Sequence, residues 1–540
     1  MASGKILDLL IIGGGHNGLV CAFYAARAGL SVRVIEKNDI VGGAAITEEF
    51  HPGFRNSVAA YTVSLLNPKI IADMQLARHG LRIVKRKALN FLPLPDGGHL
   101  LNGPGRTQAT IADRNEKDGR AYPAYAAELD RVSDILRELV LVRPPNLVEG
   151  GLHRVLPELL RTAGLGRRLA RLDAFGRQNF LDLLTRSAGD YLDGWFEDEA
   201  VKALLGFDAI VGNFASPFQP GSAYVLLHHV FGDVDGERGL WGHAIGGMGA
   251  ITQAMAKAAG GAGAAIETGV AVEKVLIDGT RAVGVRLAGG REIIANRIAS
   301  NLNPKLLFTR LVEGAPLPPA FDRRMKTWRN GSGSFRMNLA LSRLPDFTAL
   351  PGDGDHLTAG ILIGPSLAYM DKAWRDAVAK GWSEKPAIEM LIPSTLDDSL
   401  APKGAHVASL FCQHVNPTLP AGTDWEAARE TIAQLMIKTV DAYAPGFAES
   451  VAGIQALGPL DLERRFGLLG GDIFHGAMGL DQLFSARPAL GYADYRTPIS
   501  GLYQCGSGTH PGGGVTGAPG HNAAREIIHD WRSGRRFVLS

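Results

Sequence analysis

The sequence predicts an α/β fold, and three of its features support that prediction. An apolar run at residues 7–12 leads directly into a glycine-rich turn. A helical segment rich in Ala and Leu follows at residues 16–28, and a second apolar run comes at residues 31–35. This strand–helix–strand order is typical of a parallel sheet. With 540 residues, the chain is long enough for two or three domains with buried cores.

Composition narrows the class of protein. Hydrophobic residues make up 46% and charged residues 20% of the chain, an ordinary globular balance, and the net charge of +2 gives no support to a nucleic-acid partner. Cys21, Cys412 and Cys505 form no C-x-x-C pair, which argues against a disulfide scaffold and against a redox-active dithiol. The 15 histidines show no H-E-x-x-H pattern and no Cys/His cluster, so we expect no metal.

The sequence predicts a cytoplasmic protein, with peripheral membrane contact as an open alternative. No stretch approaches the roughly 20 uncharged apolar residues that a membrane span requires. The run at residues 6–12 is short, contains Asp8 and lacks a cleavage site, which favours a buried strand over a signal peptide. The basic stretch 153–186 is typical either of a solvated helical face or of an amphipathic surface on anionic lipid. Its arginines are Arg154, Arg161, Arg167, Arg168, Arg171, Arg177 and Arg186.

The glycine-rich turn predicts a dinucleotide site. Residues 13–18 fit G-x-G-x-x-G between a strand and a helix. In this motif the first glycine makes the tight turn, the second lets a diphosphate approach, and the third lets helix and strand pack closely. Glu36 ends the second strand, about 20 residues further on, where an acid accepts hydrogen bonds from a ribose hydroxyl and argues against NADP. The expected contacts are Gly13, Gly15, His16, Asn17, Gly18 and Glu36.

Other segments resemble those of flavoproteins and favour FAD over NAD. Residues 36–43 resemble the acid-to-Gly-Gly extension of the amine oxidase and phytoene desaturase type. Residues 501–517 resemble the C-terminal flavin motif of bacterial carotenoid desaturases, and residues 246–250 with the strand at Val272 also match that superfamily. The resemblance implies that FAD contacts Lys37, Gly42, Gly43, Ala44, Val272, Gly506, Ser507, Gly513, Gly514 and Val515.

Within that superfamily the chain resembles the branch called pyridine nucleotide-disulfide oxidoreductase domain-containing protein 2 over nearly its whole length. The similar stretches are residues 42–49, 217–221, 224–229 and 470–475. The absent C-x-x-C argues against disulfide chemistry despite that name. An arginine usually follows Gly-Gly in the wider desaturase pattern, where this chain has Ala44, so the diphosphate contact is missing or comes from elsewhere.

We therefore expect a discontinuous Rossmann-type FAD-binding domain and an α+β substrate domain of helices and an antiparallel sheet. The FAD-binding parts are expected at 1–95, 241–310 and 466–540, the helical part at 96–240, and the antiparallel sheet at 311–465. Strands are predicted at residues 334–341, 387–392 and 406–415, a helix at 425–443, and hairpins formed by 282–287 and 292–299. The C-terminus is predicted to repeat strand, glycine loop and helix.

Flavin itself carries hydride transfer, so the protein need only orient the substrate and shape the pocket. His475, just before the C-terminal motif, is the expected catalytic polar group near the ring, with a hydrogen-bonded loop or core histidine as the alternative. His228 and His229 lie in an apolar run and are weaker pocket candidates. His510 lies inside the flavin loop, where it either contacts the cofactor or supports the loop.

The leading interpretation is an FAD-dependent oxidoreductase, a dehydrogenase, desaturase or oxidase that transfers hydride between flavin and a largely apolar small molecule. Two alternatives stay open: a flavin-dependent isomerase or saturase of a polyene, and an FAD-binding interaction protein with little catalysis. No second G-x-G-x-x-G follows a strand, so we expect no separate NAD domain and electron transfer to oxygen, a quinone or another acceptor.

Overall fold

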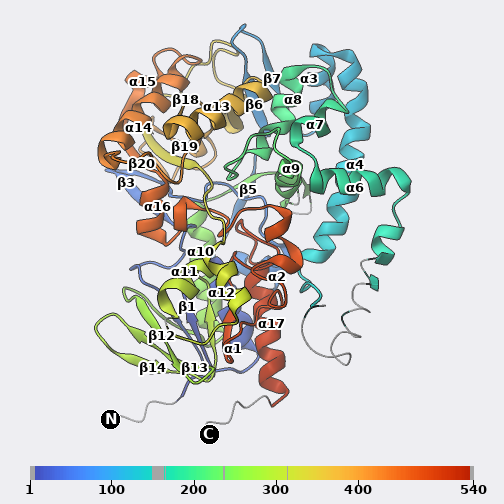
Figure 1. Cartoon of the computed structure of the whole chain (residues 1–540). Coiled ribbons are helices and arrows are strands. Elements are labelled where there is room, and N and C mark those ends of the chain that lie inside the picture. The colour runs from blue at the N-terminus through green and yellow to red at the C-terminus, as the bar shows by residue number, and fades with distance from the viewer. Residues whose placement is uncertain are drawn as a thin grey trace.

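The computed structural model describes residues 6–146, 148, 158, 163–164, 166–230, 232–234, 237–312 and 314–534. In Figure 1 the two chain ends lie at the bottom beside a nucleotide-binding part. A mainly antiparallel sheet stands at the upper left and a group of helices at the upper right. The prediction of an α/β Rossmann-type domain joined to a part with helices and an antiparallel sheet is confirmed.

The nucleotide-binding part is built on a five-stranded parallel sheet in the order β11-β2-β1-β15-β21. Its strands are β11 (Ala265–Glu267), β2 (Val32–Ile35), β1 (Leu9–Ile12), β15 (Ile298–Ser300) and β21 (Leu502–Gln504). They come from the first, middle and last segments of the chain, as a discontinuous domain requires. Strands β1, β15 and β21 are buried along their whole length because both faces of the sheet are covered.

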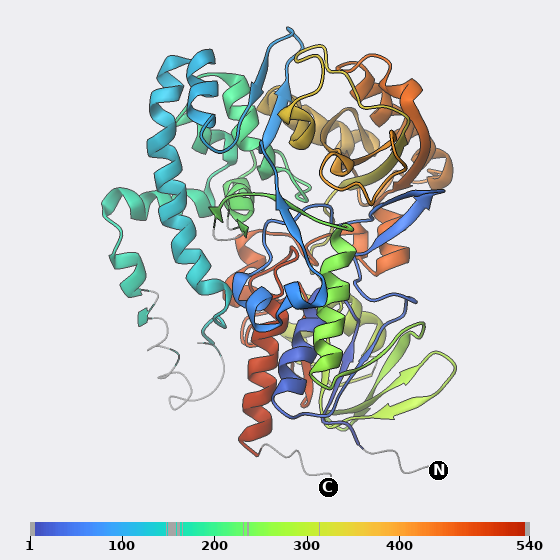
Figure 2. The same cartoon turned by 180° about the vertical axis from the view of Figure 1, so that it is seen from behind.

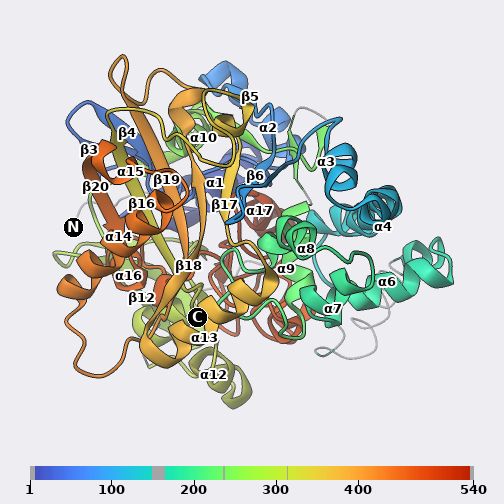
Figure 3. The same cartoon turned by 90° about the horizontal axis from the view of Figure 1, so that it is seen from above.

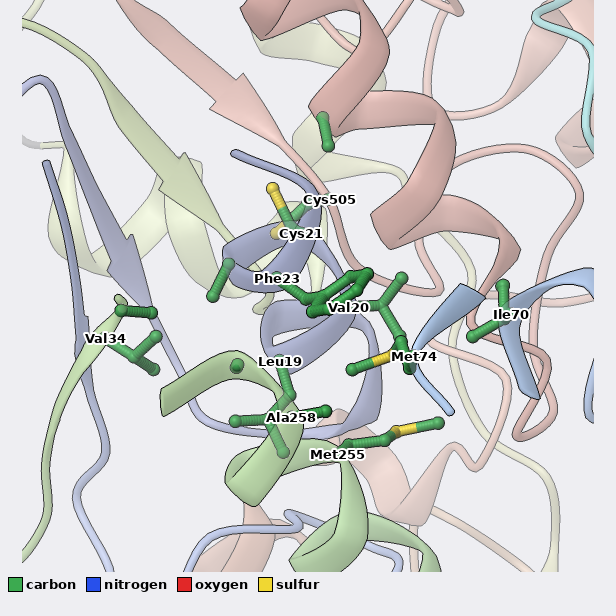
Figure 4. Close-up of a cluster of buried hydrophobic side chains, with 14 of the residues drawn as sticks. Leu19, Val20, Cys21, Phe23, Val34, Ile70, Met74, Met255, Ala258 and Cys505 are labelled. Atoms are coloured by element: carbon green, nitrogen blue, oxygen red, sulfur yellow. The ribbon is translucent and has the colours of Figure 1, made fainter. Parts of the chain in front are cut away.

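Three helices cover one face of this sheet. They are α1 (His16–Arg27), α10 (Met248–Gly261) and α17 (Ala518–Arg532), which lie side by side in Figure 2. Leu19 and Val20 of α1 pack with Met255 and Ala258 of α10 in the core drawn in Figure 4. All three cysteines are buried free thiols, and Cys21 and Cys505 belong to this core as small apolar side chains.

A three-stranded antiparallel sheet covers the other face. It consists of β12 (Val272–Asp278), β13 (Arg281–Leu287) and β14 (Glu292–Ile294). The predicted hairpin of 282–287 with 292–299 is correct only for its first part. Residues 292–294 pair with β13, but the prediction is wrong for the residues that follow them. Residues 298–300 instead form β15, which pairs parallel with β1. A short apolar run does not reveal its partner strand, and here the buried position beside β1 decides the pairing.

The second sheet has seven strands in the order β20-β16-β19-β18-β17-β6-β7. Its strands are β20 (Val451–Leu457), β16 (Ser334–Leu341), β19 (His406–Val415), β18 (Trp382–Leu391), β17 (Gly360–Ile363), β6 (Asn90–Pro93) and β7 (His99–Leu101). Strands β16 and β19 have the predicted bounds. Strand β6 lies within the range 1–95 expected for FAD binding, yet it pairs with β17 in this sheet. The boundary expected at residue 95 therefore falls between two strands of one sheet.

Alternate residues of the second sheet face two different cores. Leu410 and Cys412 of β19 pack with helix α14 (Trp425–Asp441), whereas Phe411 between them packs with the helical part. Figure 3 shows the helical part beside this sheet. It contains α3 (Thr107–Arg114), α4 (Glu116–Val140), α6 (Ala174–Thr185), α7 (Ala188–Asp193), α8 (Glu199–Gly206), η2 (Phe207–Ala209) and α9 (Ser222–Val230). Because side chains alternate along each strand, one face of this sheet packs on α14 and the other on the helical part.

The basic stretch 153–186 is only partly within the described residues. Arg154 and Arg161 lie outside them. Arg168 forms an ion pair with Glu138 at 2.7 Å, and Arg177 donates to the carbonyl oxygen of Leu172 at 3.0 Å. Some of the arginines are therefore used within the fold, and peripheral membrane contact stays a prediction. Within the described ranges, no helix is both long enough and apolar enough to cross a bilayer.

Candidate cofactor and substrate site

One cavity lies at the carboxyl ends of the parallel strands and is lined by all three nucleotide-binding segments. Strand β1 has β2 on one side and β15 on the other, so the chain order reverses there, which is where α/β sheets bind ligands. The structure brings these predicted residues together in the lining: Gly13, Gly15, His16, Glu36, Lys37, Gly42, Gly43, Ala44, Val272, His475, Ser507, Gly514 and Val515.

Four predicted contacts lie behind the lining: Asn17, Gly18, Gly506 and Gly513. The Asn17 amide donates to the Ser507 hydroxyl at 3.1 Å and so ties the first loop to the last. A Cβ on Gly18 would come within 2.2 Å of the Gly13 carbonyl oxygen, which no side chain tolerates. These residues shape the cavity rather than face it.

Glu36 closes one end of the cavity with a fixed carboxylate. Only 4% of the residue is exposed. One oxygen accepts from the Gly14 N–H at 2.8 Å, and the other accepts from the backbone and side-chain nitrogens of Asn38 at 2.9 and 3.0 Å. A carboxylate has about four acceptor sites, so one of them remains free on Oε2 for a ribose hydroxyl. Beside it, burial lowers the pKa of Lys37, and Val272 lines the same end.

The middle of the cavity is marked by His16, the first residue of α1. Burial lowers the pKa of His16 to about 4, so the ring is neutral at pH 7. Its Nε2 and the Oδ1 of Asn17 are buried, and neither has a hydrogen-bond partner among the described residues. Buried polar atoms are normally paired, so the unpartnered Nε2 of His16, which lines the cavity, fits a bound polar group there.

His475 lies in the same cavity in an uncommon conformation. Its φ is +58°, in the left-handed region that side chains other than glycine rarely adopt. The Trp328 indole holds it by donating to its carbonyl oxygen at 3.0 Å. Burial lowers the pKa of His475 to about 3, and its Nδ1 has no partner in the described part of the chain. The residue thus lines the cavity with a neutral imidazole, and its catalytic role stays a prediction.

The other three candidate histidines differ in whether they line the cavity. His510 does not line the cavity; its Nε2 lies 3.0 Å from the Leu139 carbonyl oxygen, so it supports the loop against α4. His229 lines the cavity and His228 does not. The loop continues to α17, whose N-cap is Gly517 and whose first turn contains Pro519, so the predicted order of strand, glycine loop and helix is confirmed.

A polar cluster that the sequence does not predict lies at Tyr61, where the lining is largely apolar. The Tyr61 hydroxyl donates to Oε2 of Glu389 at 2.5 Å, and the Arg336 guanidinium lies 4.5 Å from the centre of the Tyr61 ring. Burial raises the pKa values of both Tyr61 and Glu389. Nothing in the local sequence marks these residues, because they meet only when β18 and β16 pack beside residue 61. The surrounding wall is apolar and includes Leu65, Val211, Phe411, Ile473 and Phe474.

Comparison with known proteins gives the family. Residues 11–74 match the model described as NAD(P)-binding Rossmann-like domain. A rat protein named pyridine nucleotide-disulfide oxidoreductase domain-containing protein 2 is 41% identical over 546 residues, which cover 97% of this chain and 94% of the rat protein. This chain belongs to the pyridine nucleotide-disulfide oxidoreductase domain-containing protein 2 family. The resemblance inferred from the sequence is confirmed.

This family member is also similar to more distant oxidoreductases. Phytoene desaturase (lycopene-forming) of Pantoea ananas is 24% identical, with 94% of this chain and 96% of the desaturase covered. A solved structure of a putrescine oxidase triple mutant superposes with a TM-score of 0.58 at 17% identity, covering 98% of this chain and 99% of that one. The pyridine nucleotide-disulfide oxidoreductase domain-containing protein 2 homologue is therefore an oxidoreductase with a flavoprotein-type Rossmann domain.

Proposed function

We propose that this protein binds one FAD and transfers hydride between the flavin and a largely apolar small molecule, as a dehydrogenase, desaturase or oxidase. One observation carries the proposal. A single cavity begins at the fixed carboxylate of Glu36, passes the N-terminus of α1, and ends between the glycine loop at Gly514 and an apolar wall. Such a succession suits a ribose, a diphosphate and a flat ring in that order.

The residues present fit FAD. Glu36 would accept from a ribose hydroxyl, and the first N–H groups of α1 would bind the diphosphate. No arginine lines the cavity among the described residues, which agrees with Ala44 standing where an arginine is usual. The buried Nε2 of His16 supplies a polar contact in that neighbourhood. When bound, FAD accepts or donates hydride, and glycines 512–514 of the C-terminal loop, which have no side chains, would let the ring approach.

The substrate side can hold an apolar molecule and exclude water. Phe411, Val211 and Leu65 provide the apolar surface, which favours substrates with little polarity near the reacting bond. His475 is proposed as the polar group beside the ring, because its neutral imidazole has an unused nitrogen. Oxygen or a quinone is proposed as the electron acceptor. Tyr61 and Glu389 hold one proton in a short hydrogen bond at the edge of this space.

Anaerobic reduction of the bound flavin tests the proposal. Small apolar compounds that contain an oxidisable carbon–carbon or carbon–nitrogen bond should bleach the visible flavin absorbance, and admission of the acceptor should restore it. His475→Ala should slow bleaching at unchanged FAD content, whereas His510→Gln, which changes a loop support outside the cavity, should slow it less. Product formation without consumption of an acceptor would favour an isomerase instead. An unbleached flavin and no product with any compound would favour the interaction protein.

A further inference from the structure

A second cavity, of about 660 Å³, adjoins the cofactor cavity on the side of the helical part. It lies between the segment from β6 to α3, helices α4 and α9, the short helix η2, and residues 237–241. His229 and Trp241 line both cavities, so the two cavities meet at these side chains. Their rings are nearly parallel, at 17° with centroids 6.3 Å apart.

The second cavity has an acidic lining. Asp130, Asp208 and Glu237 line it, and no Lys or Arg does so among the described residues. Two of these carboxylates have cationic partners: Asp130 lies 4.0 Å from Arg137, and Glu237 lies 2.5 Å from Lys85.

Asp208 differs from the other two carboxylates. Its side chain has no hydrogen bond and no ion pair within the described part of the chain, and burial raises its pKa to about 7. Asp208 is half-buried and lines the cavity without the cationic partner that the other two carboxylates have among the described residues.

Two neighbouring side chains add hydrogen-bond acceptors and a ring face. His229 is 7% exposed, and its Nδ1 lies 2.8 Å from the Val225 carbonyl oxygen. Nδ1 must therefore donate, which leaves Nε2 as an acceptor, and burial lowers the pKa so that the ring stays neutral. Tyr125 is 5% exposed, lines the cavity, and its hydroxyl has no hydrogen-bond partner among the described residues. Acceptors, a carboxylate and aromatic faces together match a cation with several N–H donors.

We propose that the second cavity binds the protonated amine of an amphipathic substrate, with Asp208 as its ionic partner. In this assignment the apolar tail lies against His229 and Trp241, where the two cavities meet, and extends toward Phe411 in the cofactor cavity. This assignment rests on the proposed function, because the tail is the part that meets the flavin. The amine is a recognition group away from the reacting bond, and an anionic head group would be repelled by the same lining.

Calorimetric titration of the purified, flavin-loaded full chain with n-hexylamine and hexan-1-ol tests the proposal. The two probes have the same apolar chain and differ in charge. The amine should bind at least roughly tenfold more tightly than the alcohol, since a hydrogen bond to a charged group contributes about 1.5–3 kcal/mol. Asp208→Asn should remove that preference and leave the affinity for the alcohol unchanged. Asp130→Asn, at a carboxylate that is already ion-paired, should keep the preference.

Equal affinity for the two probes, no saturable binding of hexylamine, or an unchanged preference in Asp208→Asn would contradict this assignment. Each titration requires no turnover, so its result is independent of the redox test. A preparation that binds hexylamine through Asp208 and yet contains no FAD would contradict the proposed function and leave the amine site standing. If both Asp208→Asn and Asp130→Asn lost the preference for the amine, the negative charge of the whole lining would explain it. That result would contradict the assignment of Asp208 as the ionic partner.

Discussion

Glu36 is the single residue whose charge should matter most for cofactor retention. Glu36→Gln removes a charged acceptor from the ribose and should weaken FAD binding by roughly 1.5–3 kcal/mol, about tenfold or more. Equilibrium dialysis of the apoprotein against FAD measures the change. Glu267→Gln on β11 is the matched control, because Glu267 pairs with Arg33 at 3.8 Å and does not line the cavity. Equal FAD affinity in wild type and Glu36→Gln would remove the ribose assignment.

Gly514 should be needed for redox function more than for folding. Its φ is +90°, and a Cβ there would lie 2.6 Å from Cδ1 of Leu65 at the cavity wall. Gly514→Val should therefore lower bound flavin or its reduction rate sharply, while the melting temperature of the apoprotein moves little. Gly404→Val controls for backbone strain alone, since Gly404 has φ +82° and no atom near its Cβ position. Normal FAD occupancy and reduction in Gly514→Val would show that this loop is a linker.

At the residue scale, motif spacing predicts the cofactor side of the cavity and not the substrate side. The glycines and Glu36 are constrained by local geometry over about 20 residues, so their order alone predicts a role. Tyr61, Glu389 and Asp208 come from separate elements, and each one is an ordinary residue in its own segment. They come near the cavity only when strands pair and helices pack, and no local sequence pattern predicts that arrangement.

Among the elements, the segment that carries His475 depends on Arg487. This arginine is 0% exposed and donates to the carbonyl oxygens of Phe474 at 2.6 Å, Gln482 at 3.0 Å and Ser507 at 2.8 Å. It therefore joins the segment before the flavin loop to the loop itself. Burial lowers its pKa to about 10, yet the group remains charged at pH 7.

Arg487→Lys should destabilise the protein by about 2–3 kcal/mol, because a lysine cannot reach several carbonyls as the planar guanidinium does. Chemical denaturation measures the free energy of unfolding, and FAD content should fall in the same preparation. Arg329→Lys is the control: Arg329 is exposed, and surface ion pairs contribute about 0–1 kcal/mol. Equal stability of Arg487→Lys and wild type would show that this arginine is not a support of the cofactor loop.

The elements differ in how well sequence patterns predict them. Strands β16 and β19 have the predicted bounds because turn residues mark both ends of each apolar run. The strands within residues 292–299 are harder to predict, because β14 of the small antiparallel sheet and β15 of the parallel sheet are separated by only three residues. Partner choice in a sheet is a tertiary property, and periodicity is the same for both kinds of strand.

For the whole molecule, burial of neutral histidines makes stability depend on pH. Burial lowers the pKa to about 3 for His228, His414 and His475 and to about 4 for His16 and His510. In the unfolded chain they titrate near 6.5, so below that pH the unfolded state binds more protons. Stability is therefore fully present above about pH 6.5 and decreases as the pH falls toward the folded values.

The free energy of unfolding should thus decrease between pH 7.5 and 5.5, by up to roughly 1.4 kcal/mol per pH unit for each histidine. Denaturation at the two pH values with FAD in constant excess measures this. His414→Gln should reduce the slope, since this ring lies away from the cofactor cavity and its Nε2 is 3.2 Å from the Asn213 carbonyl oxygen. A stability that is constant or increases on acidification would contradict the assignment of these histidines as neutral.

The central claim is that segments from both ends and the middle of the chain enclose one FAD. Denaturing the purified protein and identifying the released cofactor by chromatography and mass spectrometry tests it most directly. The protein should be yellow and should release FAD at close to one equivalent per chain. Release of FMN, of NAD or of no nucleotide, together with failure of the folded protein to bind added FAD, would contradict it.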